Sequence, residues 1–343
     1  MGVSISDIIP KKEISHNELK GKIIAIDAFN TLYQFLTTIR QPDGTSLMDN
    51  KGRITSHLSG LFYRNINLIQ EGIIPVYVFD GKPPELKKAE LERRREQKGI
   101  AKEKFETAKG IGDREGMKKF SGRFVSLTDE IINESKELLE AMGIPVIQAP
   151  GEGEAEASLL CRTGKVWAAA SQDFDALLYG TPILIRNLTL SGKRKTSTGL
   201  YVDVELELIN FEKVLNQLQI DKDQLICLAI LVGTDYNPGG VRGLGQKKAL
   251  ELVQNYKYPV KIFEYIERSK NYELNFNWQE IFEHFHNYEV SHNGEVEFRD
   301  LDEDKVKKIL LEHDFSPARI DSGIEKIKKV KEEKKQKGLQ EFF

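Results

Sequence analysis

The sequence predicts an α/β protein with a central, mostly parallel twisted sheet flanked by helices. Short runs of apolar and β-branched residues recur along the chain, and an acidic residue closely follows each of them. Segments with helical periodicity separate these runs. The 343 residues are enough for one large α/β domain or for two smaller ones. Since ligands gather at the carboxyl ends of parallel strands, the acids are expected at one edge of the sheet.

The densest signal is the stretch from Val166 to Leu178. A small apolar run ends at Ala170, and Asp173 and Asp175 follow it two residues apart. A solvated turn is the commoner explanation of an Asp-x-Asp pair that stands alone. The pattern recurs, however, at strand-like runs over residues 22–26, 73–79 and 144–149, which are followed by Asp27, by Asp80, and by Glu152 and Glu154. This repetition favours a functional acid cluster over separate turns.

Helical periodicity fills the intervals between the predicted strands. Residues 1–21 form a lead-in with a few apolar anchors, and helices are predicted over residues 30–36, 55–70, 127–142, 155–160, 211–218 and 223–231. Two short strands are predicted over residues 183–185 and 201–204, on either side of a turn rich in Gly, Ser and Lys.

Composition limits the class of protein. Lys and Arg number 50 against 53 Asp and Glu, so a nucleic-acid ligand would require basic patches separated from an acidic site. Both cysteines, Cys161 and Cys227, lie in apolar stretches, which predicts a reduced intracellular protein. No apolar run reaches the length of a membrane span, so no membrane partner is expected.

Residues 82–135 form a charged insertion that begins directly after Asp80. Basic residues, including Lys87 and Arg94, alternate with glutamates at helical spacing. A solvated helix held by ion pairs between successive turns explains this pattern. A basic helical element above the active site, in contact with phosphates, explains both the pattern and its position.

A glycine-rich loop over residues 233–245 joins two predicted helices. It carries Asp235, which is a further candidate for the acid cluster, and it ends in Gly243 and Gly245, with Lys247 and Lys248 just inside the next helix. Amide groups at such a helix start bind phosphates, so the loop predicts a helix–turn–helix that grips the DNA backbone without reading sequence. A plain glycine-rich connection is the alternative.

Seven acids converging at one sheet edge would require cations. Two carboxylates about 4 Å apart repel by roughly 4 kcal/mol at an effective dielectric constant near 20. Oxygen ligands without His or Cys favour Mg²⁺ or Mn²⁺ over Zn²⁺. Two such ions suit phosphodiester hydrolysis, because they activate a water and stabilise the leaving oxygen.

The motifs together resemble the flap endonucleases, and most closely the archaeal members. The residues that carry this resemblance are Val78–Pro84 (VFDGKPP), Gly151–Ala155 (GEGEA), Ser171–Asp175 (SQDFD), Gly233–Tyr236 (GTDY) and Gly243–Gly245 (GLG). They occur in the family's order and span essentially the whole chain. The resemblance implies an Mg²⁺-dependent 5′ flap endonuclease and 5′–3′ exonuclease with two-metal-ion catalysis, Mn²⁺ able to substitute, acting in Okazaki fragment maturation and DNA repair.

The resemblance also implies roles for single residues. It assigns metal ligation to Asp27, Asp80, Glu152, Glu154, Asp173, Asp175 and Asp235, and contact with the scissile phosphate to Lys87 and Arg94. It assigns DNA contacts to Gly2, Tyr33, Gly243, Gly245, Lys247, Lys248 and Arg319. Gly2 would pack at the DNA junction after loss of Met1, and Arg319 lies in an element that receives a one-nucleotide 3′ flap. Glu156 is expected on a helix, outside the ligand set.

The glycine loop is similar to the family's helix–three-turn–helix, where backbone oxygens hold a K⁺ ion. Residues 238–240, Pro-Gly-Gly, depart from the family pattern, so no side-chain ligands are assigned to that ion.

The end of the chain resembles the peptide box by which replication proteins dock on a PCNA-type sliding clamp. The matching residues are Gln336, Leu339, Phe342 and Phe343, after a highly charged segment. A short helical turn would place the apolar side chains in a hydrophobic pocket of the clamp. A tail folded back on its own domain is the alternative.

The expected organisation is a single nuclease domain over residues 1–327 with a flexible tail over residues 328–343. Within the domain we expect an N-terminal part at about 1–105, a helical arch at about 82–135, an internal nuclease part at about 127–255 and a C-terminal helical part at about 256–327. The protein is expected to be a monomer in the cytoplasm or nucleoid, or in the nucleus of a eukaryote.

Three other functions compete with this prediction. A phosphatase would need Asp-x-Asp directly after the first strand, whereas Asp27 is followed by Ala28 and Phe29. A clamp-bound DNA scaffold without catalysis would have no use for an acid cluster that destabilises the fold. A bubble-cutting repair nuclease of the same fold would differ mainly in the arch, and the short charged arch here favours capture of a free 5′ end, by threading or by clamping.

Overall fold

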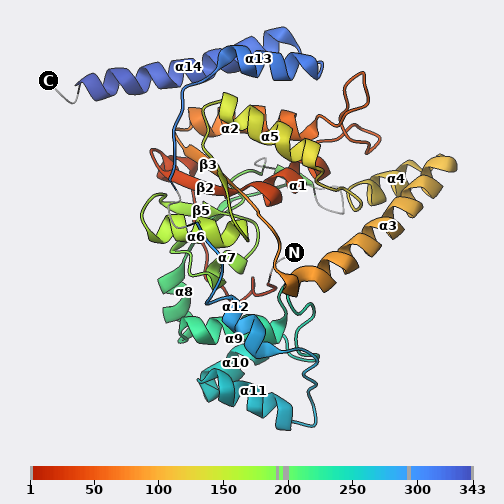
Figure 1. Cartoon of the computed structure of the whole chain (residues 1–343), viewed down its shortest axis with the longest axis vertical. Coiled ribbons are helices and arrows are strands. Elements are labelled where there is room, and N and C mark those ends of the chain that lie inside the picture. Colours follow the sequence, from red (N-terminus) through yellow and green to blue (C-terminus); the bar gives the residue numbers. More distant parts are fainter. Residues whose placement is uncertain (1–2, 191–192, 196–200, 292–294, 341–343) are drawn as a thin grey trace.

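A seven-stranded sheet forms the centre of the computed structural model, which describes residues 3–190, 193–195, 201–291 and 295–340 (Figure 1). The strand order is β1-β9-β6-β5-β2-β3-β4. The strands of this sheet are β1 (Lys12–Ile14), β2 (Ile23–Asp27), β3 (Ile74–Phe79), β4 (Val146–Gln148), β5 (Ala168–Ala170), β6 (Ile183–Arg186) and β9 (Leu206–Asn210).

The sheet is mostly parallel, as the sequence predicts. Strand β2 pairs in parallel with β3 and β5, and the parallel pairing continues to β4 on one side and to β6 on the other. Two antiparallel strands, β9 and β1, complete the edge beyond β6 and were not predicted. The strand predicted over residues 201–204 exists as β8 (Tyr201–Asp203), but it pairs with β7 (Lys193–Lys195) in a separate hairpin.

Side chains of the central strands alternate between two apolar layers. Ile24 and Ile26 of β2 join one core cluster, whereas Ala25 between them joins another. Since successive side chains in a strand point to opposite faces, both faces of the sheet are covered. The first cluster includes residues of α1 (Ala28–Thr38), α2 (Ser56–Gln70) and α5 (Asp129–Ala141), and the second includes residues of α6 (Gly153–Arg162).

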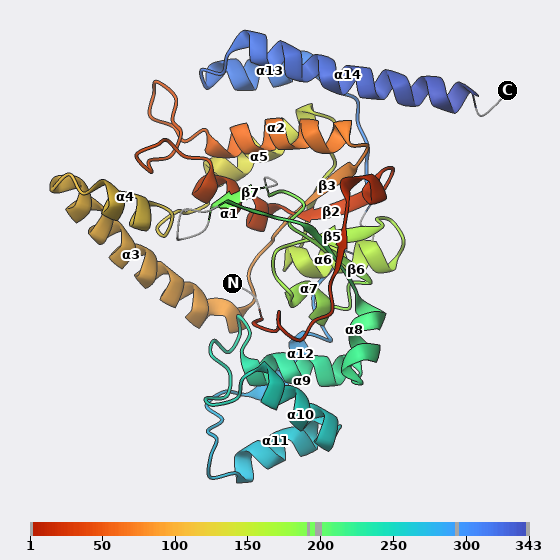
Figure 2. The same cartoon turned by 180° about the vertical axis from the view of Figure 1, so that it is seen from behind.

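A third core cluster is formed mainly by the helices between Asp175 and His284. It is built around α9, whose residues from Leu225 to Leu231 are all fully buried. The helices of this part are α7 (Asp175–Leu178), α8 (Phe211–Leu218), α9 (Lys222–Val232), α10 (Gln246–Tyr256), α11 (Pro259–Arg268) and α12 (Trp278–His284). Figure 2 shows α9 to α12 together below the sheet.

A helical hairpin projects from the side of the domain. It consists of α3 (Lys88–Gly110), preceded by the 3₁₀ turn η2 (Glu85–Lys87), and α4 (Arg114–Ser121) (Figures 1 and 2). Phe105 is buried where α3 meets α4, and its ring contacts that of Phe124. The rest of α3 is largely exposed and carries few apolar residues. The insertion that the sequence places at about 82–135 thus contains this hairpin, and α5 already packs in the domain.

Helices α13 (Glu303–Glu312) and α14 (Pro317–Gln340) lie on the outer side of α2. A small polar network ties the corner between them to the domain. Glu134 of α5 contacts His57 at 2.9 Å and His313 at 3.2 Å, and Asp49 contacts Arg53 at 2.7 Å and His313 at 3.4 Å. Both histidines are buried, and the network links the end of α13 to α2, to α5 and to the segment before α2.

Helix α14 continues through residues 328–340, the segment that the sequence assigns to the tail. The C-terminal end of α14 extends past the rest of the domain in Figures 1 and 2. Among the described residues, no helix is both long enough and apolar enough to cross a membrane.

Candidate active site

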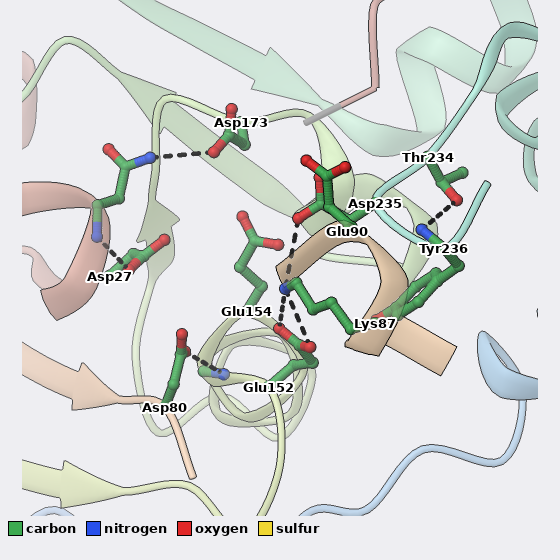
Figure 3. Close-up of polar contacts among 12 residues, drawn as sticks. Asp27, Asp80, Lys87, Glu90, Glu152, Glu154, Asp173, Thr234, Asp235 and Tyr236 are labelled. Atoms are coloured by element: carbon green, nitrogen blue, oxygen red, sulfur yellow. Dashed lines mark hydrogen bonds and ion pairs between the residues drawn. The ribbon is translucent and has the colours of Figure 1, made fainter. Parts of the chain in front are cut away.

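The carboxyl ends of three adjacent parallel strands supply four of the predicted acids. Asp27 is the last residue of β2, Asp80 follows β3, and Asp173 and Asp175 follow β5. Glu152 and Glu154 lie at the start of α6, and Asp235 lies on the loop after α9. Figure 3 shows these acids, except Asp175, around Glu154.

Two small polar residues, Asn30 and Ser171, each connect Asp27 of β2 to another acid of the cluster. The side chain of Asn30 donates to Asp173 Oδ2 at 3.1 Å, and its backbone N–H donates to Asp27 Oδ1 at 2.9 Å. The hydroxyl of Ser171 lies 3.2 Å from Asp27 Oδ2 and 3.1 Å from Glu154 Oε1. Sequence reasoning missed both residues, although each stands within three residues of a predicted ligand.

Asp80 is held by the first turn of α6. The backbone N–H of Gly153 donates to Asp80 Oδ1 at 2.7 Å, and a Cβ at position 153 would lie 2.5 Å from that oxygen. A side chain at this position would therefore displace the carboxylate. This close approach explains why the second glycine of the GEGEA motif, Gly153, has no side chain.

Lys87 and Arg94 bring positive charge to the cluster from the base of the projecting hairpin. Lys87 Nζ contacts Glu152 at 2.9 and 3.1 Å and Asp235 Oδ2 at 3.4 Å. Arg94 Nη2 contacts Asp235 Oδ1 at 2.6 Å. Burial alone would lower the pKa of Lys87, but the charges of Glu152 and Asp235 raise it above its ordinary value. This lysine therefore stays protonated.

The beginning of the chain also reaches the cluster. The backbone N–H of Val3 donates to Asp175 Oδ1 at 2.8 Å. Gly2, which the resemblance places at the DNA junction, lies outside the described residues. Val3 is a contact that sequence reasoning did not find, because the contact joins segments 172 residues apart.

Burial and mutual repulsion make the acids difficult to ionise together. Burial raises the pKa of Asp27 to about 7, that of Asp175 to about 7 and that of Asp80 to about 6. Burial also raises the pKa of Glu154 well above its ordinary value. In each case the charges of neighbouring carboxylates add to the rise.

The donor set fits a hard divalent cation. All the candidate ligands are carboxylates. Burial, with repulsion from neighbouring carboxylates, raises the pKa of Asp27, Glu154 and Asp175, and a bound cation would relieve that repulsion. Across the described ranges, no three His, Cys, Asp or Glu side chains are already arranged around one point as a metal cage. Glu152 and Asp235 are instead paired with Lys87 and Arg94. Ion binding therefore requires these side chains to rearrange.

A divalent cation should stabilise the protein more at high pH than at low pH. The folded-state pKa values of Asp27, Asp80 and Asp175 are raised, so their protonated forms favour folding below about pH 4, and this contribution is lost as the pH rises through 6 to 7. For one carboxyl whose pKa is raised from 3.8 to about 7, the free energy of unfolding falls by about 4 kcal/mol. A cation that neutralises the cluster offsets it.

The measurement is thermal unfolding at several pH values, with MgCl₂ and with a chelator. We expect the difference in melting temperature between the two conditions to grow from pH 5 to pH 8. Taking the difference removes the effect of titrating groups outside the site. A difference that stays constant or shrinks over this range would contradict the assignment of these acids to a cation site.

The glycine loop and the start of α10 form a separate, exposed surface. Gly243, Gly245, Lys247 and Lys248 are all exposed, and a Cβ at either glycine would meet nothing within 4 Å. Gly243 has a φ of 88°, in the left-handed region that favours glycine. The backbone N–H groups at the start of α10 are thus open to a ligand.

The remaining predicted DNA contacts lie apart from the acids. Tyr33 is on α1, where Lys98 of α3 places Nζ 5.1 Å from its ring centroid. Arg319 is exposed near the start of α14. Glu156 is buried and accepts hydrogen bonds from the backbone and hydroxyl of Ser291, so it holds a loop and does not face the other acids.

Of the predicted tail residues, Gln336 and Leu339 have a helical backbone in α14. Phe342 and Phe343 lie outside the described residues.

Comparison with known proteins gives consistent matches. The XPG N-terminal domain matches residues 1–101 and the XPG I-region matches residues 143–235. Flap endonuclease 1 of Thermococcus onnurineus is 52% identical over 345 residues, which cover 100% of this chain and 99% of that protein. The solved flap endonuclease-1 from Methanococcus jannaschii superposes with a TM-score of 0.76 at 40% identity, covering 97% of this chain and 100% of that one.

A further similarity concerns the fold alone. The catalytic core of Rad2 in complex with a DNA substrate has a TM-score of 0.71 at 22% identity, over 92% of this chain and 96% of that chain.

Proposed function

This chain belongs to the flap endonuclease family, and we propose that it cuts 5′ flaps from branched double-stranded DNA by hydrolysing a phosphodiester bond at the carboxylate cluster. One observation carries the proposal. Lys87 and Arg94, at the base of a projecting helical hairpin, pair with Glu152 and Asp235 of the acid cluster, whose other aspartates stand at the carboxyl ends of β2, β3 and β5. Such a site combines ligands for cations with positive charge for a phosphate.

The residues proposed to hold Mg²⁺ are the seven acids of the cluster, directly or through water: Asp27, Asp80, Glu152, Glu154, Asp173, Asp175 and Asp235. When bound, two such ions activate the attacking water and stabilise the leaving oxygen. Mn²⁺ meets the same requirements for hard oxygen ligands. Asn30 and Ser171 would keep these acids in place. Asn30 contacts Asp27 and Asp173, and Ser171 contacts Asp27 and Glu154.

Lys87 and Arg94 are proposed to bind the scissile phosphate. Their side chains now neutralise Glu152 and Asp235. A phosphate entering the site would compete for the same cations and release these carboxylates to bind metal. The exchange keeps the local charge balanced, because an incoming anion replaces an anion as the partner of each basic side chain.

The DNA duplex is proposed to lie along the start of α10. Its phosphates would be bound by the exposed N–H groups after Gly243 and Gly245 and by Lys247 and Lys248. Backbone oxygens of the same loop are candidates for a K⁺ ion. Gly2, Tyr33 and Arg319 would contact the DNA near the branch and the 3′ flap, as the family resemblance implies.

The biological setting follows from this activity. Removal of 5′ flaps and 5′–3′ exonuclease action suit Okazaki fragment maturation and DNA repair, in the compartment that holds the DNA and a PCNA-type clamp. We propose that the protein acts as a monomer.

The proposal is tested with DNA substrates that differ only in structure. A double flap, a bubble, a nicked duplex and a single strand of matched sequence are each incubated with the protein and MgCl₂. We expect the double flap to be cut fastest, at the branch, with release of the intact flap. Preferential cutting of the bubble would instead place the protein with bubble-cutting nucleases, and cutting of all four at one rate would contradict structure-specific recognition.

Replacement of Phe342 and Phe343 by alanine is expected to remove binding to the sliding clamp. These two aromatic side chains would supply most of the apolar area that a short docking peptide buries. Calorimetry with the purified clamp measures the affinity, and we expect a loss of at least about a hundredfold. Cleavage without clamp serves as the control and should stay at the wild-type rate. Unchanged clamp affinity would show that the tail is not the docking segment.

A further inference from the structure

Helix α3 contains one buried acid that the proposed mechanism does not use. Glu90 is 3% exposed, and within α3, which the structure describes in full, it is the only charged residue that is buried. The other buried residues of α3 are Ala101, Phe105 and Ala108, near the far end of the hairpin. A buried carboxylate at the near end needs partners, because burying a charge without them is costly.

Two arginines from the next turn of the same helix are these partners. Arg93 donates through Nε at 2.6 Å and through Nη2 at 2.8 Å. Arg94 donates through Nε to Glu90 Oε1 at 2.7 Å. Hydrogen bonding from Arg93 lowers the pKa of Glu90, with Arg94 adding to the effect. The carboxylate is therefore ionised in the working pH range.

Arg94 connects this internal pair to the acid cluster. Its Nε is bonded to Glu90, while its Nη2 is bonded to Asp235 Oδ1 at 2.6 Å. A guanidinium has a fixed planar set of donors, so engaging Nε limits how the rest of the group is presented. With Glu90 in place, Arg94 reaches Asp235 through one terminal nitrogen in the described contacts.

Loss of the Glu90 charge would change how Arg94 is shared between Glu90 and Asp235. Arg94 would have a single carboxylate partner, Asp235, and a free Nε edge that allows a bidentate pair with it. Asp235 is one of the proposed metal ligands, and Lys87 also contacts it. A stronger Arg94–Asp235 pair would compete with cations for the same oxygens.

We infer that Glu90 is a positioning residue that holds Arg94 by its Nε edge and so limits the competition between Arg94 and the metal for Asp235. The inference rests on the proposed nuclease function and adds a residue to it. The described side-chain contacts of Glu90 are to Arg93 and Arg94 and not to the acids of the cluster. It acts through Arg94, and its removal should therefore have no effect when Arg94 is absent.

The test compares Glu90→Gln with Glu92→Gln, which makes the same charge change at an exposed position of the same helix. Calorimetry with MgCl₂ measures cation affinity without DNA, and single-turnover cleavage of a double flap measures the rate over a series of Mg²⁺ concentrations. For Glu90→Gln we expect Mg²⁺ binding to weaken by about tenfold and the Mg²⁺ concentration for half-maximal rate to rise by a similar factor. Glu92→Gln should match the wild type in both measurements.

The same comparison in an Arg94→Ala background separates positioning from a general structural role. There, Glu90→Gln should no longer change Mg²⁺ affinity, because the residue through which it acts has gone. Glu90→Asp, which keeps the charge, should recover part of the affinity. An equal effect with and without Arg94, or wild-type Mg²⁺ affinity of Glu90→Gln, would overturn the inference. Absence of cleavage by the wild type would instead refute the proposed function, and the calorimetric comparison would still decide the role of Glu90.

Discussion

Replacement of Asp173 by alanine is expected to abolish flap cleavage while leaving flap binding in place. Asp173 follows β5 at the carboxyl edge of the sheet, and Asn30 holds its Oδ2 at 3.1 Å beside Asp27. Removing this carboxylate removes a proposed cation ligand from the centre of the cluster. A loss of about 4 kcal/mol of transition-state stabilisation corresponds to a rate lower by roughly a thousandfold.

Binding should survive because the proposed duplex contacts lie elsewhere, at the start of α10. Removal of a negative charge near the scissile phosphate also weakens its repulsion of DNA, so the affinity should stay the same or increase. Single-turnover cleavage and fluorescence anisotropy with a labelled double flap measure the two properties. Asp173→Asn should be equally inactive, because the amide keeps the shape and loses the charge.

The matched control is Asp304→Ala, which removes an exposed aspartate on α13 and should behave as the wild type. Thermal unfolding of all variants checks that the fold is retained. Substantial turnover by a folded Asp173→Ala protein would contradict the assignment of this acid to the cation site.

Replacement of Lys87 or Arg94 by alanine is expected to slow the chemical step by about a hundredfold, with little change in DNA affinity. Both side chains bring a positive charge to the acid cluster, where the scissile phosphate is proposed to bind. Charge that stabilises a developing oxyanion acts mainly on the transition state and hardly on the ground state. Single-turnover rates at saturating protein separate the chemical step from binding.

The same variants should lose more stability relative to the wild type without metal than with it. Lys87→Ala leaves Glu152 without its basic partner and Asp235 with Arg94 alone, which raises repulsion inside the cluster. We therefore expect a lower melting temperature in chelator and a smaller difference in MgCl₂.

Weaker DNA binding with an unchanged single-turnover rate would show that these residues serve affinity and not the chemical step.

The central acids could be predicted because strand order and local pattern act together. Asp27, Asp80 and Asp173 each follow an apolar run, and the structure places those runs side by side as β2, β3 and β5. Parallel strands bring their carboxyl ends to one edge, so a pattern visible in each segment translates into proximity between segments.

Strands β1 and β9 could not be predicted, because their sequences lack the alternation that marks a half-buried strand. In β9 the buried residues are Leu206 and Ile209, which are three positions apart, and β1 has a single buried residue, Ile14. Strand β9 depends on pairing with β6, and β1 depends on pairing with β9. Their structure is therefore set by the sheet and not by local preference.

The small polar residues of the site also escaped prediction. Asn30 and Ser171 belong to types common at helix starts and turns, so their sequence context indicates nothing beyond a cap. Their role depends on β2 and β5 being neighbours. For the charged insertion, the sequence left a solvated helix and a phosphate-binding element open. In the structure most of α3 is exposed, whereas Lys87 and Arg94 at its base reach the acids.

The cation-dependent nuclease site is tested most directly by binding the protein to a 5′-labelled double flap in chelator and then adding excess Mg²⁺ rapidly. We expect the complex to be stable without metal, and Mg²⁺ to cause release of the intact labelled flap by a single cut at the branch. Cleavage in chelator at the same rate, or a stable complex that is never cut after addition of Mg²⁺ or Mn²⁺, would contradict the proposal that the carboxylate cluster is a cation-dependent nuclease site.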